Sequence, residues 1–280
     1  MIPDEGARLN RVPCPSPDSA GRLDLARPNA ARMYDYYLGG SANVAVDRAA
    51  ADELIRSLPD TVFSARANRS FLGRVVRFLT QQGIDQFLDL GSGIPTVGNV
   101  HEIAQAVNPE ARVAYVDIEP VAVSYGQKLL RDEKRVSITK ADIRRPGTVL
   151  SAQGVTDLID FTRPVAVLAV AILHVMPDAD APLEFLAEYR AACVPGSYLA
   201  ISHLSPQTWH PAEVTHSEQV YARTPTPVTY RERDEILRFM SGYDLVEPGL
   251  VLLPSWRPEE PPSAADAARS NSYGAVGRLR

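Results

Sequence analysis

The stretch F-L-D-L-G-S-G-I-P-T, residues 87–96, decides the fold class of this chain. An apolar strand, expected over residues 86–90, runs into a turn made by Gly91 and Gly93, and a helix is expected to start near Thr96. Glycines in such a turn let a ligand approach the backbone, and the following helix presents unpaired N–H groups. The stretch therefore predicts a ligand site at the end of this strand, although a Gly-x-Gly turn alone is common in loops.

Short apolar runs alternate with helical patterns after this turn. Further strands are expected over 112–117, 135–139, 164–170 and 197–202, with helices near 97–107, 120–131 and 179–193 between them. Strands that alternate with helices imply a parallel sheet with right-handed crossovers. Two late runs, 243–246 and 273–279, have little helix between them and are expected to close the sheet as an antiparallel pair. The predicted fold class is therefore α/β, with a doubly wound, mostly parallel sheet.

Helical patterns also precede the sheet. The pattern over 29–57 is interrupted at Gly39 and Gly40, which favours two helices joined by a turn. The proline-rich start of the chain has few bulky apolar side chains and is expected to be flexible. The expected organisation is a flexible segment 1–27 and a single domain 28–280, which divides into a helical lid or cap 28–82 and a sheet core 83–280 with an insertion at about 204–240.

Composition excludes several classes of protein. The chain has 280 residues and a net charge of −5, which argues against nucleic-acid binding by general electrostatic attraction. Its two cysteines form neither a disulfide framework nor a metal-binding pair, so no metal is expected. No run approaches the roughly 20 apolar residues of a membrane helix, and no secretory signal is recognisable. The sequence therefore predicts a cytoplasmic protein with no membrane partner and leaves the oligomeric state open.

Three side chains follow other strands of the predicted sheet. Asp117 ends the second strand, 24 residues after Gly93, where a doubly wound sheet places a carboxylate on a ribose. Asp142 follows the third strand, where a short acid can accept from an adenine amino group. His174 follows the fourth strand. Because the carboxyl ends of parallel strands share one edge, these side chains are expected near the glycine turn.

The turn favours one kind of adenosine ligand. A dinucleotide fingerprint needs a third glycine for close packing of helix on strand, and this chain has Ile94-Pro95-Thr96 there. A ligand with an adenosine but no phosphates makes fewer demands on the turn. S-adenosylmethionine is such a ligand, and it is the expected cofactor.

The quoted motifs resemble those of class I S-adenosylmethionine-dependent methyltransferases. The superfamily-level stretches are D-L-G-S-G, V-D-I-E-P, A-D-I and the late Y-G-A-V-G-R. More narrowly, four stretches resemble an actinobacterial S-adenosyl methyltransferase family formerly described as a domain of unknown function: P-N-A-A-R-M-Y-D-Y-Y-L-G-G (28–40), R-A-N-R-S-F-L (66–72), A-I-L-H-V-M-P-D (171–178) and V-E-P-G-L-V (246–251). This resemblance implies a seven-stranded sheet and binding of S-adenosylmethionine, but it supplies no substrate.

The resemblance also implies roles for individual residues. Gly91, Ser92 and Gly93 would line the cofactor, with Asp89 near its methionine end. Asp117 and Ile118 would meet the ribose, and Asp142 and Ile143 would bracket the adenine. Tyr34 and Gly40 would belong to a lid over the cofactor, although packing of a helix onto the body also explains the tyrosine. Arg69, together with Arg66 and Asn68, would meet the cofactor carboxylate, although a solvated helix face explains these three equally well.

The sequence thus predicts a methyltransferase that moves a methyl group from S-adenosylmethionine to an unidentified acceptor, with a small molecule favoured over a protein. If the acceptor must lose a proton, His174 is the best placed base, and His203, after the fifth strand, is the second candidate. A structural role is the usual one for a single histidine. Two alternatives remain. One is a protein that binds the cofactor without catalysis, and the other is an NAD-dependent oxidoreductase that uses the same nucleotide-binding half of the fold.

Overall fold

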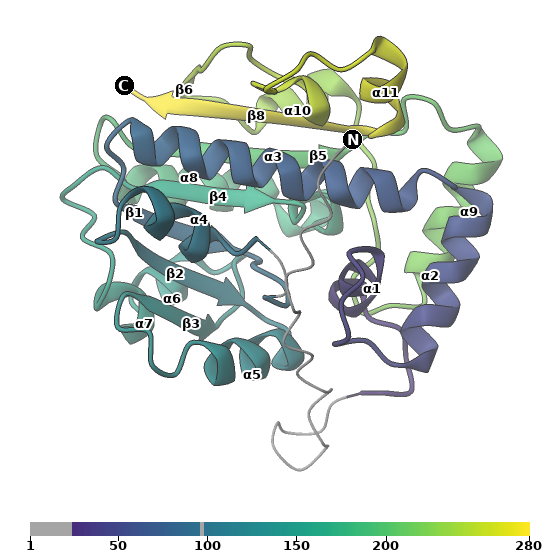
Figure 1. The fold of residues 1–280 in the computed structure, drawn as a ribbon, viewed down its shortest axis with the longest axis horizontal. Coiled ribbons are helices and arrows are strands. Elements are labelled where there is room, and N and C mark those ends of the chain that lie inside the picture. Colours follow the sequence, from purple (N-terminus) through teal and green to yellow (C-terminus); the bar gives the residue numbers. More distant parts are fainter. Residues whose placement is uncertain (1–23, 96–97) are drawn as a thin grey trace.

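A computed structural model describes residues 24–95 and 98–280. Its sheet has the hydrogen-bonded strand order β3-β2-β1-β4-β5-β8-β6, and the two-residue β7 pairs with β8 beside this path (Figure 1). The strands are β1 (Gln86–Leu90), β2 (Arg112–Asp117), β3 (Val136–Lys140), β4 (Ala166–Val170), β5 (Tyr198–Leu204), β6 (Tyr243–Leu245), β7 (Val251–Leu252) and β8 (Ser272–Leu279). The expected sheet class is therefore confirmed, and β7 is the strand that was not anticipated.

Helices surround this sheet and extend beyond one end of it. The α-helices are α1 (Ala30–Tyr37), α2 (Ala45–Ser57), α3 (Thr61–Gln81), α4 (Val100–Val107), α5 (Pro120–Leu129), α6 (Pro146–Leu150), α7 (Gln153–Thr156), α8 (Pro182–Ala192), α9 (Pro211–Tyr221), α10 (Arg233–Arg238) and α11 (Ala264–Arg269). Three short 3-10 segments, η1 (Leu173–Val175), η2 (Asp178–Asp180) and η3 (Leu253–Ser255), complete the described elements.

The five central strands run parallel, and their order reverses between β1 and β4. β1 pairs with β2 on one side and with β4 on the other, so Leu88 lies between Ala114 and Val167. All of these residues are buried, because helices cover both faces of the sheet. After β1 the chain crosses over to β2 on one side, and after β4 it crosses over to β5 on the other side. The two crossovers therefore diverge and open a crevice at the carboxyl ends of β1 and β4. This is where doubly wound sheets bind ligands.

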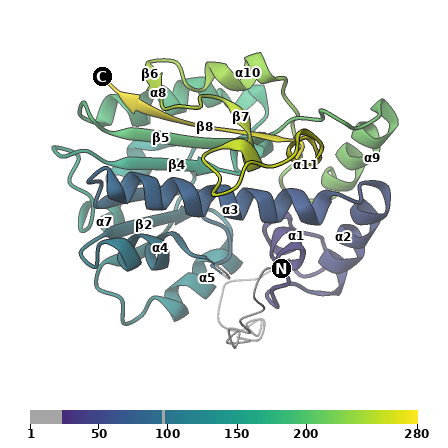
Figure 2. The same cartoon turned by 45° about the horizontal axis from the view of Figure 1, so that its top comes forward.

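The long helix α3 connects the sheet to the helical cap. One end packs with α4 over the sheet, where Phe71, Val75 and Leu79 are fully buried (Figure 2). The other end contacts α1 and α2, which form a separate apolar cluster with Val220 of α9. One rigid helix therefore fixes the position of the cap relative to the sheet edge.

A buried ion pair holds the first two helices of the cap together. Arg32 Nε lies 2.7 Å from Asp47 Oδ2, and both side chains are almost fully buried. Asp47 also accepts hydrogen bonds from the backbone amides of Asn29 and Val44. The interruption between the helices falls where it was predicted, at Gly39, which has a φ of +79°.

The helix after the glycine turn begins later than expected. α4 starts at Val100, whereas the sequence placed its start near Thr96, a residue outside the described ranges. Gly98 has a positive φ of +63°, and the Asn99 amide donates to Glu102 Oε2 at 2.9 Å. This capping contact, in which a first-turn acid bonds back to the residue before the helix, explains where the helix starts. The expected flexible segment 1–27 lies almost entirely outside the described residues.

Candidate functional site

A cavity of about 1100 Å³, partly open to solvent, lies at the carboxyl ends of β1, β2 and β4 beneath α1 and α3. We call it the switch-point cavity, because it lies where the strand order reverses between β1 and β4. It brings together nine of the predicted site residues: Tyr34, Arg69, Asp89, Gly91, Ser92, Gly93, Asp117, Ile118 and His174. These residues come from helices and strand ends that are far apart in the sequence. Their convergence is what the reversal of strand order predicts.

The glycine turn requires both of its glycines. Gly91 has a φ of +73°, and a Cβ there would lie 2.4 Å from Cγ1 of Ile172, so no side chain fits. Gly93 has a φ of +66°, but a Cβ there would meet no atom within 4 Å. The backbone at Gly93 therefore faces open space, where a ligand can approach it closely.

Asp117 holds this turn in place. Its Oδ2 accepts a hydrogen bond of 2.7 Å from the Gly93 amide, and its Oδ1 accepts one of 2.8 Å from the Glu119 amide. Burial raises the pKa of Asp117, whereas these backbone bonds lower it in part. Each carboxylate oxygen has a second lone pair, so the same side chain can still accept hydrogen bonds from a ligand's hydroxyls.

Asp89 lies on the floor of the cavity and is the most strongly perturbed acid there. Burial raises its pKa from 3.8 to about 7, and the charge of Asp117 adds to this effect. The nearby Arg69 guanidinium acts in the opposite direction. A group whose pKa is shifted this far by burial in a cavity is typical of a functional site.

Unpartnered polar atoms gather in the same cavity. In the described chain, six buried side-chain polar atoms have no hydrogen-bond partner, and four of them belong to residues that line it: Asp35 Oδ1, Arg69 Nε, Ser92 Oγ and His174 Nδ1. Such atoms cost free energy unless a partner satisfies them. Their concentration in one cavity fits a ligand that carries several polar groups.

Hydrogen bonds fix the backbone around His174, whereas the Nδ1 atom of its ring has no hydrogen-bond partner. The Thr229 amide donates to the His174 carbonyl at 2.6 Å, and Arg231 donates to the carbonyls of Leu173 and Met176. Burial and the positive charge of Arg231 lower the pKa of His174 to about 4. The imidazole is therefore neutral at physiological pH and can accept a proton.

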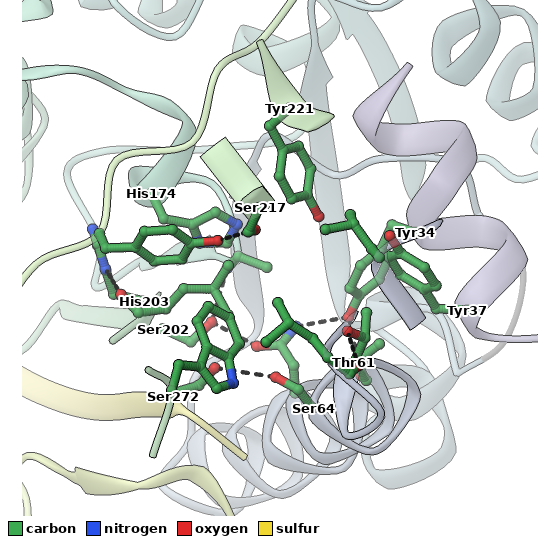
Figure 3. Close-up of a pocket in the computed structure, with 18 residues that line it drawn as sticks. Tyr34, Tyr37, Thr61, Ser64, His174, Ser202, His203, Ser217, Tyr221 and Ser272 are labelled. Carbon is green, nitrogen blue, oxygen red and sulfur yellow. Dashed lines mark hydrogen bonds between the residues drawn. The ribbon is translucent and has the colours of Figure 1, made fainter. Parts of the chain in front are cut away.

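A second cavity, of about 600 Å³, lies on the other side of His174 (Figure 3). We call it the aromatic cavity, because its walls include Tyr37, Trp209 and Tyr230 together with both His174 and His203. Five residues line both cavities: Tyr34, Asn68, Ala171, His174 and Tyr221. The two spaces thus share one wall.

A directional chain of hydrogen bonds runs through that shared wall. The Ala171 amide donates to Ser202 Oγ at 2.8 Å, and the Ser202 hydroxyl donates to Asn68 Oδ1 at 2.6 Å. Asn68 Nδ2 then donates to the Tyr34 hydroxyl at 2.8 Å, which donates to the Ala65 carbonyl at 3.2 Å. These hydrogen bonds join the ends of β4 and β5 to α3 and α1, so α1 is tied to the carboxyl edge of the sheet.

Three predicted site residues, Gly40, Asp142 and Ile143, line neither cavity. A Cβ at Gly40 would come within 2.0 Å of Asp35 Oδ1, so this glycine makes room for a buried carboxylate. Asp142 pairs with Arg144 at 2.8 Å, and this pairing lowers its pKa. Ile143 is buried in the core. The cofactor roles given to these three residues stay predictions.

Several cavity residues were not among the predicted ones. Glu119 lines the switch-point cavity, and burial together with Asp117 raises its pKa. The second acid of V-D-I-E-P was the signal that could have identified it. Tyr221 and Ala171 had no such signal, because their importance comes from contacts between distant segments. Asn68, which was expected near the cofactor carboxylate, also lines this cavity.

A doubly wound sheet with a polar cavity at its switch point defines a nucleotide-binding class of α/β proteins. A family model described as S-adenosyl methyltransferase matches residues 16–280, and the chain belongs to that family. This confirms the resemblance seen in the motifs.

Two solved structures from actinobacteria are similar to the whole domain. One, from Thermobifida fusca, is described as a candidate methyltransferase. It is 40% identical, covers 92% of this chain and 97% of that chain, and has a TM-score of 0.86. The other is a DUF574 family protein from Streptomyces avermitilis, 38% identical over 92% of this chain and 100% of that chain, with a TM-score of 0.85. The comparison with curated proteins gave no match.

Two searches of the described residues gave negative results. No helix there has the length and hydropathy needed to cross a membrane. No group of three or more His, Cys, Asp or Glu side chains in the same residues is placed to hold a metal ion.

Proposed function

We propose that this chain is a methyltransferase that binds S-adenosylmethionine in the switch-point cavity and methylates a small molecule. The carrying observation is that unpartnered buried polar atoms belong to residues that line one cavity at the carboxyl edge of the sheet, among them Arg69 Nε and Ser92 Oγ. The open backbone at Gly93 and the buried acid Asp89 fit an adenosine ligand with a charged amino-acid tail. A cytoplasmic location and an acceptor other than nucleic acid belong to the same proposal.

The bound cofactor would supply an electrophilic methyl group on a sulfonium. The protein's own part is to align the reactants and to exclude water. In this proposal Asp89 and Arg69 hold the amino-acid end, whose ammonium and carboxylate match their charges. Asp117 and Glu119 accept from the ribose hydroxyls. Tyr34 and the rest of α1 cover the site.

His174 is the proposed base for an acceptor that must lose a proton. Its Nδ1 has no partner, and it stands in the wall between the two cavities. A neutral imidazole accepts a proton from a hydroxyl as the oxygen begins to bond to carbon. His203 is less suited to this role, because its Nε2 accepts from Arg231 Nη1 at 2.9 Å, while its Nδ1 bonds to the Leu204 carbonyl.

Calorimetric titration with S-adenosylmethionine, S-adenosylhomocysteine and NAD tests this proposal. We expect both adenosyl compounds to bind and NAD to fail. The matched variants are Asp89→Asn, in the cavity, and Asp85→Asn, at the opposite end of the same strand in an ion pair with Arg163. Only Asp89→Asn should weaken binding. Binding of NAD alone would favour the oxidoreductase alternative, and cofactor binding without turnover of any acceptor would favour the non-catalytic one.

A further inference from the structure

The walls of the aromatic cavity carry no formal charge. Among the described residues that line it there is no Asp, Glu, Lys or Arg. The His203 ring is neutral by its hydrogen bonds, because a guanidinium only donates and Arg231 donates to Nε2. The pKa of His174 is lowered to about 4, so its ring is neutral as well near pH 7. Placing an ionised group here would cost several kcal/mol, because no opposite charge is present.

The cation that contacts His203, Arg231, is already committed to other partners. Arg231 donates to Asp178 Oδ1 at 2.6 Å as well as to the two carbonyls of the His174 loop. Its side chain is almost fully buried behind His203. The guanidinium therefore braces the wall and has no free donor directed at an anionic ligand.

Flat side chains dominate the surface of this cavity. The rings of Trp209 and Tyr230 meet edge to face with centroids 5.3 Å apart, and those of His174 and His203 do so at 5.8 Å. Such surfaces favour offset or edge-to-face packing against a planar ring.

One wall of the cavity is chemically different from the rest. His174, whose Nδ1 has no partner, and Ala171 belong to the lining of both cavities.

From this arrangement we infer that the aromatic cavity is the acceptor site, and that the acceptor is an uncharged aromatic molecule whose hydroxyl is methylated beside His174. The inference rests on the proposed function. The hydroxyl proton passes to the His174 ring, and an oxygen lone pair forms the bond to the methyl carbon. The carbon–sulfur bond breaks with its electron pair left on sulfur. The products are an aryl methyl ether, S-adenosylhomocysteine and a protonated imidazole that returns its proton to water.

Calorimetry on the protein saturated with S-adenosylhomocysteine tests the inference without turnover. The probes are phenol, 2-naphthol and 4-phenylphenol, each matched by the carboxylate of the same ring system: benzoate, 2-naphthoate and 4-phenylbenzoate. We expect at least one phenol to bind at least about tenfold more tightly than its carboxylate. Equal binding within every pair, or no binding by any phenol, overturns the inference.

Two variants locate the binding site. Trp209→Ala removes a ring from the aromatic cavity, and it should weaken phenol binding by about tenfold. The matched control is Phe63→Ala, because the Phe63 ring lies under Arg269 and lines neither cavity. An unchanged affinity in folded Trp209→Ala would contradict the assignment, as would displacement of the phenol by S-adenosylhomocysteine. Phenol binding can also be titrated without the adenosyl compound, so failure of cofactor binding is seen separately from failure of the acceptor site.

Discussion

The amide of Gly93 lies 2.7 Å from Oδ2 of Asp117, so the acid that ends β2 fixes the turn that follows β1. The other oxygen of the same carboxylate binds the Glu119 amide. Asp117 therefore has a structural task that does not depend on any ligand.

Replacement of Asp117 by Asn should destabilise the protein without its cofactor. The amide keeps one acceptor oxygen but turns its NH2 toward a backbone N–H, leaving one buried donor without a partner. We expect the free energy of unfolding in urea to fall by about 1–3 kcal/mol. Asp85→Asn, which breaks only an exposed ion pair, should cost about 0–1 kcal/mol. Equal losses in the two variants would mean that the Gly93 contact adds nothing to stability.

Asp89 should make the unliganded protein less stable as the pH rises. Its pKa is 3.8 when unperturbed and about 7 in the fold, so the folded state holds the proton between these values while the unfolded chain releases it. The stability from this group is full below pH 3.8 and is lost as the pH rises through about 7. Asp89→Asn should therefore raise the free energy of unfolding at about pH 8 by roughly 1–3 kcal/mol, while it weakens cofactor binding. A variant that is no more stable than the parent at this pH would contradict the expectation.

His174→Ala should separate catalysis from cofactor binding. Once an acceptor is known, we expect the turnover rate to fall by about 10²–10⁴-fold, a much larger change than that in the affinity for S-adenosylhomocysteine, whose cavity His174 also lines. Because the pKa of His174 is about 4, its ring is already neutral above that pH, and this group should not cause a loss of parent activity between about pH 5.5 and 8. The control is His216→Ala, on the exposed face of α9 near Glu53. Full activity in His174→Ala would remove this residue from the mechanism.

The hydrogen-bond chain through Ser202 should be sensitive to a single deletion. Ser202→Ala leaves the Ala171 amide without an acceptor and Asn68 Oδ1 without a donor. We expect a loss of about 1–3 kcal/mol in thermal or urea unfolding. Ser151→Ala, which removes an exposed hydroxyl bonded within α6, should have little effect. A loss no larger than that of the control would show that water replaces the missing hydroxyl.

Cofactor binding should protect the lid as well as the glycine turn. Tyr34 and Asp35 on α1 line the switch-point cavity, and Gly39, with its positive φ, lies at the end of the same helix. Closure over the ligand would reduce hydrogen exchange across residues 29–40 and at Gly91–Gly93 when S-adenosylhomocysteine is added. If only the glycine turn gains protection, α1 is a static scaffold.

The sheet could be predicted from sequence because its signals are local. Each strand is a short apolar run followed by a helix pattern, and the antiparallel closure was visible because little helix separates the last two long runs. The start of α4 was misplaced because its determinants, Gly98 and the contact between Asn99 and Glu102, lie beyond the G-S-G motif. Residues at strand ends, such as Asp89 and Asp117, were found for the same local reason as the strands.

The rest of the site depends on contacts between distant segments. Asn68 is one polar residue on a long helix, and only the fold shows that it joins Ser202 to Tyr34. Asp142 was placed by analogy with other strand-end acids, but the neighbouring Arg144 pairs with its carboxylate. Gly40 was expected in a lid over the cofactor, and its contact with Asp35 gives it a packing role. No periodicity or spacing in the sequence encodes these pairings.

The wall common to the two cavities has a consequence for the design of inhibitors. Tyr34, Asn68, Ala171, His174 and Tyr221 line both spaces, so the two ligand positions adjoin each other. A single molecule that joins an adenosine to an aromatic ring through a short linker would occupy both positions. Its second half would bind at a high effective concentration, with avidity that neither half has alone. By linkage, if binding of one half changes the affinity for the other, the effect is reciprocal and has the same coupling free energy.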